Sequence, residues 1–339
     1  MNKKRTIIAL VLVVIVVLFL NLYTLPYYVS RPGMAEEIDT VIDVEDGYDA
    51  EGKLMLTTVW MGQANIISYL MTKFNKYYEL YPLEDVRYED ETDEEYNVRQ
   101  LYYMEDSQES ALQVAFEKAG KEVHVDYKGI YVLSVLENAP ATDILVPGDR
   151  ITKIDNHAFH SSAEFTEYIQ GKKAGDTISV TFTRNDETIE KNITIDEIEE
   201  IGKPGIGIGL VDDKEVKTDP SVEINTEKIG GPSAGLMFSL EIYNQLNEED
   251  ITKGYAIAGT GTISVDGVVG PIGGIEQKIV AADKAGAEIF FAPNENGAKT
   301  SNYQNAVKTA KDIGTDMIIV PVDTFDDAIN YLNELEPKK

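Results

Sequence analysis

Two segments decide the fold of the C-terminal part of this chain: Ile229-Gly230-Gly231-Pro232-Ser233-Ala234-Gly235 and Gly270-Pro271-Ile272-Gly273-Gly274-Ile275-Glu276-Gln277-Lys278. The first opens a predicted helix, in which proline suits the first turn and the free amides favour an anion beside Ser233. The pattern makes Ser233 a candidate nucleophile, with Gly231 and Ala234 as its oxyanion loop. The alternative is an ordinary glycine-rich helix start, where serine is common because it caps.

Lys278 stands out on the second predicted helix, Ile275–Ala285. On a helical wheel Lys278 falls in the apolar sector, whereas Glu276, Gln277 and Lys284 take the opposite side. A helical lysine is normally solvated. Burial without a carboxylate would lower its pKa and leave a neutral amine that can act as a general base. Together the two anomalies predict a Ser–Lys pair for nucleophilic catalysis.

These residues resemble a known protease family. Gly231–Gly235 is similar to the GPSAG motif of Lon proteases, and Pro271–Lys278 is similar to their PIGG(L/I)xxK motif at a similar spacing. Gly261–Gly267 resembles the family's TGxITxxG, which implies that Ser264 orients the lysine. The resemblance implies a serine endopeptidase that cleaves peptides or unfolded proteins. It also implies a possible homo-oligomer, because Lon proteolytic domains tend to form rings.

The middle of the chain, from Lys121 to about Ile198, alternates short strands with turn signals. Lys128–Val132 resembles the carboxylate-binding loop and following strand of a PDZ domain, and Val146–Asp155 resembles the bacterial LxxGDxIxxI run. The resemblance implies that a peptide adds as a strand here. Its expected contacts are Gly129, Ile130, Tyr131 and Val132, with Phe165 and Ile169 lining the side-chain pocket. Alternatively, Phe165 and Ile169 pack the core.

The first thirty residues have their own composition. Basic residues at positions 3–5 precede an apolar run, and Thr6–Leu25 would be about 30 Å long as a helix, enough to cross a bilayer. Tyr23, Tyr27 and Tyr28 suit an interfacial aromatic belt. This pattern predicts a single-pass cell-membrane protein with extracytoplasmic catalytic and PDZ domains. A cleaved signal peptide is the alternative, although no small-x-small site follows Leu20.

Composition excludes several classes of function. With 59 acidic and 30 basic residues the net charge is −29, so we expect no nucleic-acid partner. The chain has no cysteine, and its three histidines lack the HExxH-type spacing of a zinc site, so we expect no metal or other cofactor. Gly297-Ala298-Lys299-Thr300 lacks the glycine that a P-loop needs before the lysine, so we expect no ATP binding.

The predicted fold class is α+β: a Lon-type proteolytic domain with an inserted β-rich PDZ domain, preceded by one transmembrane helix. The expected boundaries are 1–33 for the basic start and anchor, 34–120 for the N-terminal part of the proteolytic domain, 121–200 for the PDZ domain and 201–339 for the catalytic part. The strand near Leu54–Trp60 and the helix Gln108–Ala119 place proteolytic-domain elements before the insert. The competing function is a non-catalytic, membrane-tethered PDZ adaptor.

Overall fold

The chain divides into two compact units in a computed structural model that describes residues 3–88, 91–199, 201–226 and 229–338. The first unit comprises Met1–Asp90, Glu223–Asn225 and Ser233–Lys339, and the second comprises Glu91–Val222 and Thr226–Pro232. Helices and strands mix in both units, which confirms the α+β part of the predicted fold class.

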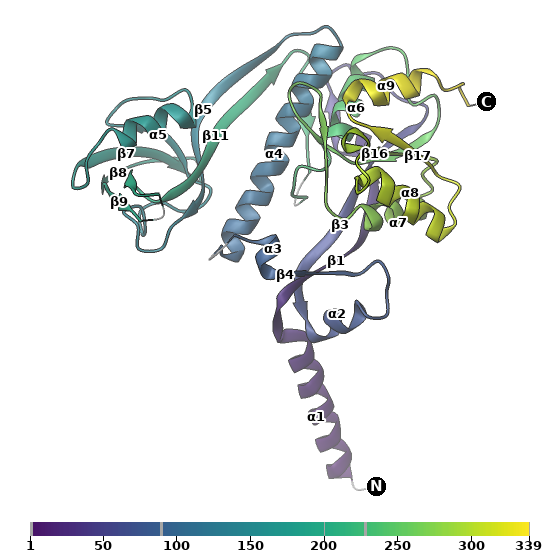
Figure 1. Cartoon of the computed structure of the whole chain (residues 1–339), viewed down its shortest axis with the longest axis horizontal. Coiled ribbons are helices and arrows are strands. Elements are labelled where there is room, and N and C mark those ends of the chain that lie inside the picture. Colours follow the sequence, from purple (N-terminus) through teal and green to yellow (C-terminus); the bar gives the residue numbers. More distant parts are fainter. Residues whose placement is uncertain (1–2, 89–90, 200, 227–228, 339) are drawn as a thin grey trace. The chain divides into compact units, whose positions relative to one another are not determined.

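A six-stranded mixed sheet organises the first unit, in the order β17-β16-β13-β3-β1-β4 (Figure 1). Its strands are β1 (Thr24–Glu37), β3 (Lys53–Asn65), β4 (Glu79–Pro82), β13 (Ala256–Gly259), β16 (Ile289–Pro293) and β17 (Ile318–Val322). Strand β13 pairs in parallel with β3 on one side and β16 on the other, whereas β1 is antiparallel to β3 and β4. Segments separated by some 200 residues therefore meet at the centre of one sheet.

Helices cover both faces of this sheet. The main ones are α6 (Gly235–Leu246), α7 (Ile275–Ala285), α8 (Asn302–Ile313) and α9 (Phe325–Asn333). Consecutive strand residues face opposite ways: Phe290 packs in the cluster with α7 and α8, whereas Phe291 meets Tyr331 of α9, with ring centroids 6.0 Å apart. Helices α6 and α9 lie on one side of the strands, and α7 and α8 on the other (Figure 1). The site's helices are thus held by two separate apolar layers.

Shorter elements complete the first unit. They are α1 (Lys3–Leu22), η1 (Ile38–Thr40), β2 (Ile42–Val44), α2 (Ile66–Met71), α3 (Leu83–Val86), β14 (Thr262–Ile263), β15 (Val269–Gly270) and η2 (Glu295–Gly297), together with β12 (Val222–Ile224), which pairs with β2. The hairpin β14–β15 follows the central strand β13 directly and leads into α7. It therefore connects the strand end at Gly259 to the helix that carries Lys278.

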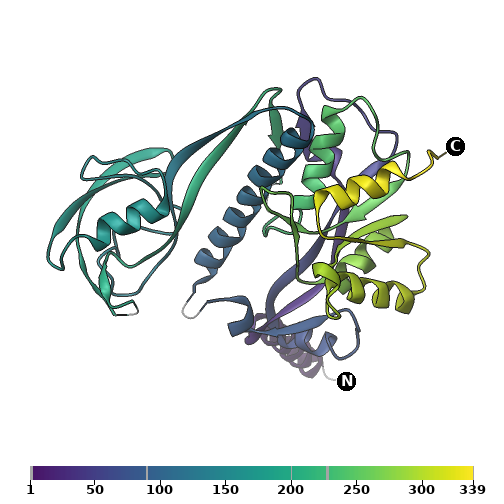
Figure 2. The ribbon, with the colours of Figure 1, turned by 45° about the horizontal axis from the view of Figure 1, so that its top comes forward.

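The second unit is built on a five-stranded antiparallel sheet in the order β11-β5-β6-β7-β8. Its elements are α4 (Asp93–Lys118), β5 (Val123–Val135), β6 (Arg150–Ile154), α5 (Ser162–Gln170), β7 (Thr177–Arg184), β8 (Glu187–Thr194), β9 (Asp196–Ile198), β10 (Lys203–Gly205) and β11 (Ile208–Thr218). Helix α5 lies against this sheet (Figures 1 and 2) and buries Phe165 and Ile169 in the core. The sheet continues past residue 200, because β11 forms its edge.

The N-terminal helix differs from its prediction. In the described part of the chain, no helix is long and apolar enough to cross a membrane. Helix α1 ends at Leu22, which leaves roughly 26 Å from Thr6 against about 30 Å of hydrocarbon. The chain then enters β1 at Thr24, and Tyr28, expected at an interface, is 4% exposed and accepts a hydrogen bond from Arg87 Nε.

The predicted transmembrane helix is therefore wrong, and so is the single-pass membrane localisation that depended on it. Of the predicted basic start, Met1 and Asn2 lie outside the described residues.

Candidate active site

Ser233 lies immediately before helix α6, and its backbone is fixed from the end of strand β13. The Ser233 carbonyl accepts two hydrogen bonds, from the Gly261 amide at 2.9 Å and from Thr260 Oγ1 at 2.9 Å. The next residue, Ala234, is the N-cap of α6 and is 6% exposed. A glycine-rich start followed by a buried helix therefore holds the serine hydroxyl at the boundary between the core and solvent.

Lys278 reaches Ser233 from helix α7. Its Nζ lies 2.7 Å from Ser233 Oγ, and the lysine is only 2% exposed. The preceding Gly274 adopts a left-handed conformation at φ 71°, and its carbonyl accepts the Lys278 amide at 3.0 Å. The structure brings together the two residues that the sequence singled out, which lie on different elements of the first unit.

Burial sets the protonation state of Lys278. Removal from water lowers the pKa of its amine to about 7, and no neighbouring carboxylate acts against this shift. A substantial fraction of the amine is thus neutral near pH 7. The neutral amine can accept the proton of a serine hydroxyl at hydrogen-bond distance, which a charged ammonium cannot do.

Thr260 is a site residue that the sequence analysis missed. It is fully buried directly after strand β13, and its Oγ1 accepts a hydrogen bond from Lys278 Nζ at 2.8 Å. The same hydroxyl donates to the Ser233 carbonyl, so one side chain contacts both residues. The available signal was a hydroxyl residue at the end of a buried strand, just before Gly261.

Ser264 does not take the role expected of it. It is exposed in the β14–β15 turn, where its hydroxyl accepts from the Val268 amide at 3.2 Å. The expectation that Ser264 orients Lys278 is corrected: the match was placed four residues too late, and Thr260 holds the amine.

The two residues expected to form the oxyanion loop, Gly231 and Ala234, differ in their surroundings. The Gly231 amide donates to the Gln100 carbonyl at 2.8 Å, so it is already used within the second unit and the expectation for Gly231 is corrected. Ala234, by contrast, stands at the start of α6, where the first amides of a helix have no intrahelical acceptor. Among the described residues no cluster of histidine, cysteine or carboxylate side chains could hold a metal ion.

The residues expected to bind a peptide in the second unit lie elsewhere. Strand β5, which contains Ile130 and Val132, has β11 on one side and β6 on the other, so no edge is open to an added strand. Both residues are fully buried. Gly129 faces the Ile151 carbonyl at a distance that leaves no room for a Cβ, and Tyr131 stacks on Tyr102. A peptide cannot add beside β5, so that prediction is corrected.

Phe165 and Ile169 follow the alternative interpretation. They are 2% and 3% exposed and belong to the core cluster that also holds Ile130, Val132 and Phe182. Helix α5 turns its apolar face inward, and it is the other face that borders open space. A cavity of about 660 Å³ is lined there by Ala163, Thr166 and Gln170 of α5 and by Leu210 of the edge strand β11, among others.

Serine peptidases use a nucleophilic serine beside a base. This site has such a pair, a serine at the start of a helix and a buried lysine. Comparison with known proteins identifies two domains in the chain. Residues 223–333 match the Lon protease (S16) C-terminal proteolytic domain, and residues 110–195 match a PDZ domain. The chain therefore contains a Lon-type proteolytic domain and a PDZ domain.

Individual Lon proteases match about a third of the chain. The Lon protease of Metamycoplasma arthritidis is 32% identical over 108 residues, which is 32% of this chain and 12% of that protein. The Lon protease of Campylobacter concisus is 36% identical over 109 residues, again 12% of its length. Among solved structures, the PDZ domain of an SdrC-like protein from Listeria monocytogenes is 46% identical, with a TM-score of 0.25, covering 26% of this chain and 93% of that one.

Proposed function

We propose that this chain is a serine endopeptidase that cleaves peptides or locally unfolded proteins without ATP, with Ser233 as nucleophile and Lys278 as general base. The observation that carries the proposal is the 2.7 Å approach of Lys278 Nζ to Ser233 Oγ, in a site that lowers the pKa of the amine to about 7. Activation of the hydroxyl and supply of a proton to the leaving group are then tasks of a single side chain.

The proposed reaction has two stages. Neutral Lys278 takes the proton of Ser233, and the alkoxide attacks the peptide carbonyl while amides at the start of α6 stabilise the oxyanion, each worth about 3 kcal/mol of barrier. The ammonium of Lys278 gives its proton to the leaving amine, which leaves an acyl-serine. Water, deprotonated by the same amine, then releases the acyl group and restores Ser233.

The second unit supports substrate selection in this proposal. Strand β11 is the sheet edge, and the cavity between it and α5 is open, so an extended peptide can add along β11 with its side chains against Thr166 and Gln170. This moves the proposed peptide site from β5 to β11 and α5. Assembly into a homo-oligomer stays a prediction.

The test compares three single substitutions in the purified full-length chain. Ser233→Ala and Lys278→Met should abolish hydrolysis of an unstructured protein such as casein, with no ATP present. Ser264→Ala, an exposed serine on the same unit, should retain activity and is the matched control. If Ser233→Ala cleaves casein as fast as the unsubstituted chain, the enzyme proposal fails and the non-catalytic adaptor takes its place.

A further inference from the structure

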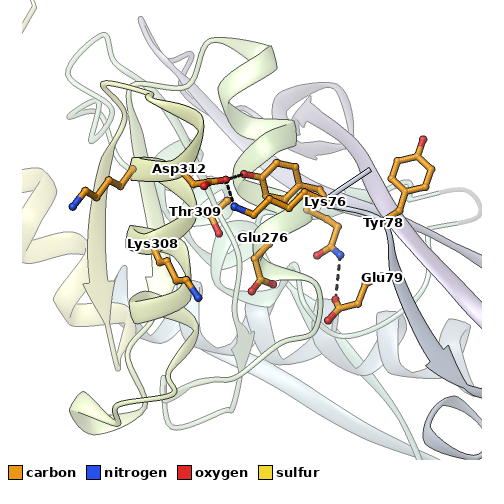
Figure 3. Close-up of a pocket in the computed structure, with 10 residues that line it drawn as sticks. Lys76, Tyr78, Glu79, Glu276, Lys308, Thr309 and Asp312 are labelled. Carbon is orange, nitrogen blue, oxygen red and sulfur yellow. Dashed lines mark hydrogen bonds and ion pairs between the residues drawn. The ribbon is translucent and has the colours of Figure 1, made fainter. Parts of the chain in front are cut away.

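A second cavity, this one in the first unit, does not include the Ser233 site. It has a volume of about 590 Å³, within the range of small-molecule sites, and neither Ser233, Thr260 nor Lys278 lines it. Its walls come from three places: the segment that ends at Glu79 in β4, the first turn of α7 at Glu276, and helix α8 (Figure 3).

The charges that line the cavity balance. Three lysines face three carboxylates, so the lining favours neither a net anion nor a net cation. One pair is internal: Lys76 Nζ lies 2.5 Å from Asp312 Oδ2, and the Tyr77 hydroxyl donates to the same carboxylate. This pair ties the α2–β4 connection to α8 and leaves two lysines and two glutamates for other partners.

The remaining four charges form no ion pair within the described part of the chain, although Glu79 Oε2 accepts a hydrogen bond from the Tyr81 hydroxyl at 2.5 Å, which leaves only part of that carboxylate open to a ligand. Glu79 and Glu276 form no ion pair with any described residue, and neither do Lys308 and Lys311. In Figure 3 the carboxylates of Glu79 and Glu276 lie along one part of the cavity, and Lys308 approaches from α8. The cavity thus has an anionic wall and a cationic wall within one small volume.

Gln277 adds an unsatisfied group to the anionic wall. It is 1% exposed, and its Nε2 donates to Glu79 Oε2 at a long 3.2 Å. Its Oε1 has no hydrogen-bond partner among the described residues. Burying a carbonyl oxygen without a donor is unfavourable, so a ligand that supplies N–H groups here removes that cost.

We propose that this cavity binds a small zwitterion, an amino acid or short peptide, with its ammonium on Glu79 and Glu276 and its carboxylate on Lys308. An ammonium on Glu79 competes with Gln277 Nε2, and the freed amide can turn so that Oε1 accepts from the ligand. The identity of the ligand rests on the proposed function, because short peptides are the products of peptide hydrolysis. The binding itself does not depend on catalysis.

Occupancy of the cavity bears on the active site through one helix. Gln277 directly precedes Lys278 on α7, so a change at the Gln277 amide acts one residue from the general base. The cavity and the general base therefore share one helix.

The experiment measures triglycine binding by isothermal titration calorimetry to the full-length Ser233→Ala protein, which cannot turn the peptide over. We expect binding that weakens by about tenfold when the peptide is N-acetylated, and again by about tenfold when its C-terminus is amidated, as for a loss of about 1.4 kcal/mol each. Glu276→Gln and Lys308→Gln should each weaken triglycine binding to a similar extent. Lys284→Gln changes an exposed lysine near the C-terminal end of α7 that does not line the cavity, so it is the control and should leave binding unchanged.

Absence of triglycine binding overturns the proposal, and so does binding that is insensitive to Glu276→Gln and Lys308→Gln. A loss of affinity on blocking only one end of the peptide overturns the assignment to a zwitterion. These results are independent of the proposed protease activity, since an inactive chain can bind triglycine and an active chain can fail to bind it.

Discussion

Lys278 combines two properties that oppose each other in a folded protein. It is a long amine that is 2% exposed, and burial lowers its pKa to about 7 with no carboxylate to offset the cost. Structural lysines of this kind are rare because an apolar residue of the same size packs more favourably. The site therefore gives up stability to keep a neutral amine beside Ser233 Oγ.

The first prediction concerns rate and pH. Initial rates of peptide hydrolysis should rise as pH increases through about 7, because the amine of Lys278 becomes the active base only after losing its proton. Lys278→Arg should be inactive at every pH, since guanidinium stays charged. A pH–rate profile from pH 5 to 9 measures both, and a substantially active Lys278→Arg chain would contradict the dyad.

The second prediction concerns stability. Between pH 7 and 10.5 the unfolded chain binds a proton at this lysine that the folded chain does not, so stability rises with pH across that window. Below about pH 7 both states are protonated and the folded state bears the full burial cost. Lys278→Met should therefore raise the urea midpoint of the first unit most at pH 6, with a gain that narrows towards pH 10. The exposed Lys284→Met is the control and should show no such pH-dependent gain.

The third prediction separates Thr260 from Ser264. Thr260→Val keeps the side-chain shape but removes the hydroxyl that lies 2.8 Å from Lys278 Nζ, so we expect kcat to fall roughly tenfold, about one lost hydrogen bond. The pH–rate profile should also shift, because the amine has lost a partner, and Thr260→Ser should restore both. Ser264→Ala should behave as the unsubstituted chain. Equal losses in Thr260→Val and Thr260→Ser would show that only packing is affected.

At the scale of elements, the sequence predicted which residues carry the chemistry better than it predicted which segments pack around them. The apolar face of α7 follows from its spacing, and the structure confirms burial of Ile275, Lys278 and Ile279. Gln277 was expected on the solvated side but is 1% exposed, because the chain segment around Glu79 covers it. A helical wheel reports the periodicity of one helix and carries no information on a distant segment that packs over its polar side.

Strand β5 illustrates the same limit. The residues from Ile130 to Val132 were expected to form a strand, and they do, whereas Lys128 and Gly129, expected in a loop, lie within the same strand. What the local pattern does not contain is the pairing: β11, some 80 residues later, occupies the edge that the peptide was expected to use. Pairing partners in a sheet depend on long-range topology, so strand existence was predictable and strand position was not.

The fourth prediction belongs to the groove between α5 and β11. Thr166→Arg places a long side chain in the cavity that borders Leu210, so binding of a peptide with a free C-terminus, selected on a peptide array, should weaken at least tenfold. Thr188→Arg makes the same change on β8, an exposed strand at the opposite edge of the sheet, and should leave binding unchanged. Fluorescence polarisation measures both. Equal affinities for the two variants would exclude this groove as the peptide site.

At the scale of the whole molecule, the chain enters and leaves the five-stranded sheet of the second unit through a pair of long strands. Strands β5 and β11 pair along their length, from Ile208 with Val135 to Thr218 with Val123. The point where the chain enters this sheet and the point where it leaves are therefore adjacent, as an inserted domain requires. The expected boundary at residue 200 does not meet this condition, because it falls between the paired strands.

The last prediction uses that pairing to place the excision. Replacing residues 123–218 with a short Gly/Ser linker removes β5 and β11 together, and because their ends are direct partners, the linker need span only neighbouring strands. We expect this chain to fold and to keep Ser233 reactive towards a small acylating probe, since Ser233, Thr260 and Lys278 all belong to the first unit.

Replacing residues 121–198 instead removes β5 but leaves β11, an 11-residue strand with both edges unpaired. Such an edge is a template for aggregation, so this second chain should be largely insoluble. Probe labelling and size-exclusion chromatography of the two chains, made in parallel, measure the difference. If the 121–198 replacement is the soluble and reactive one, β11 folds without β5 and the insert ends near residue 200 after all.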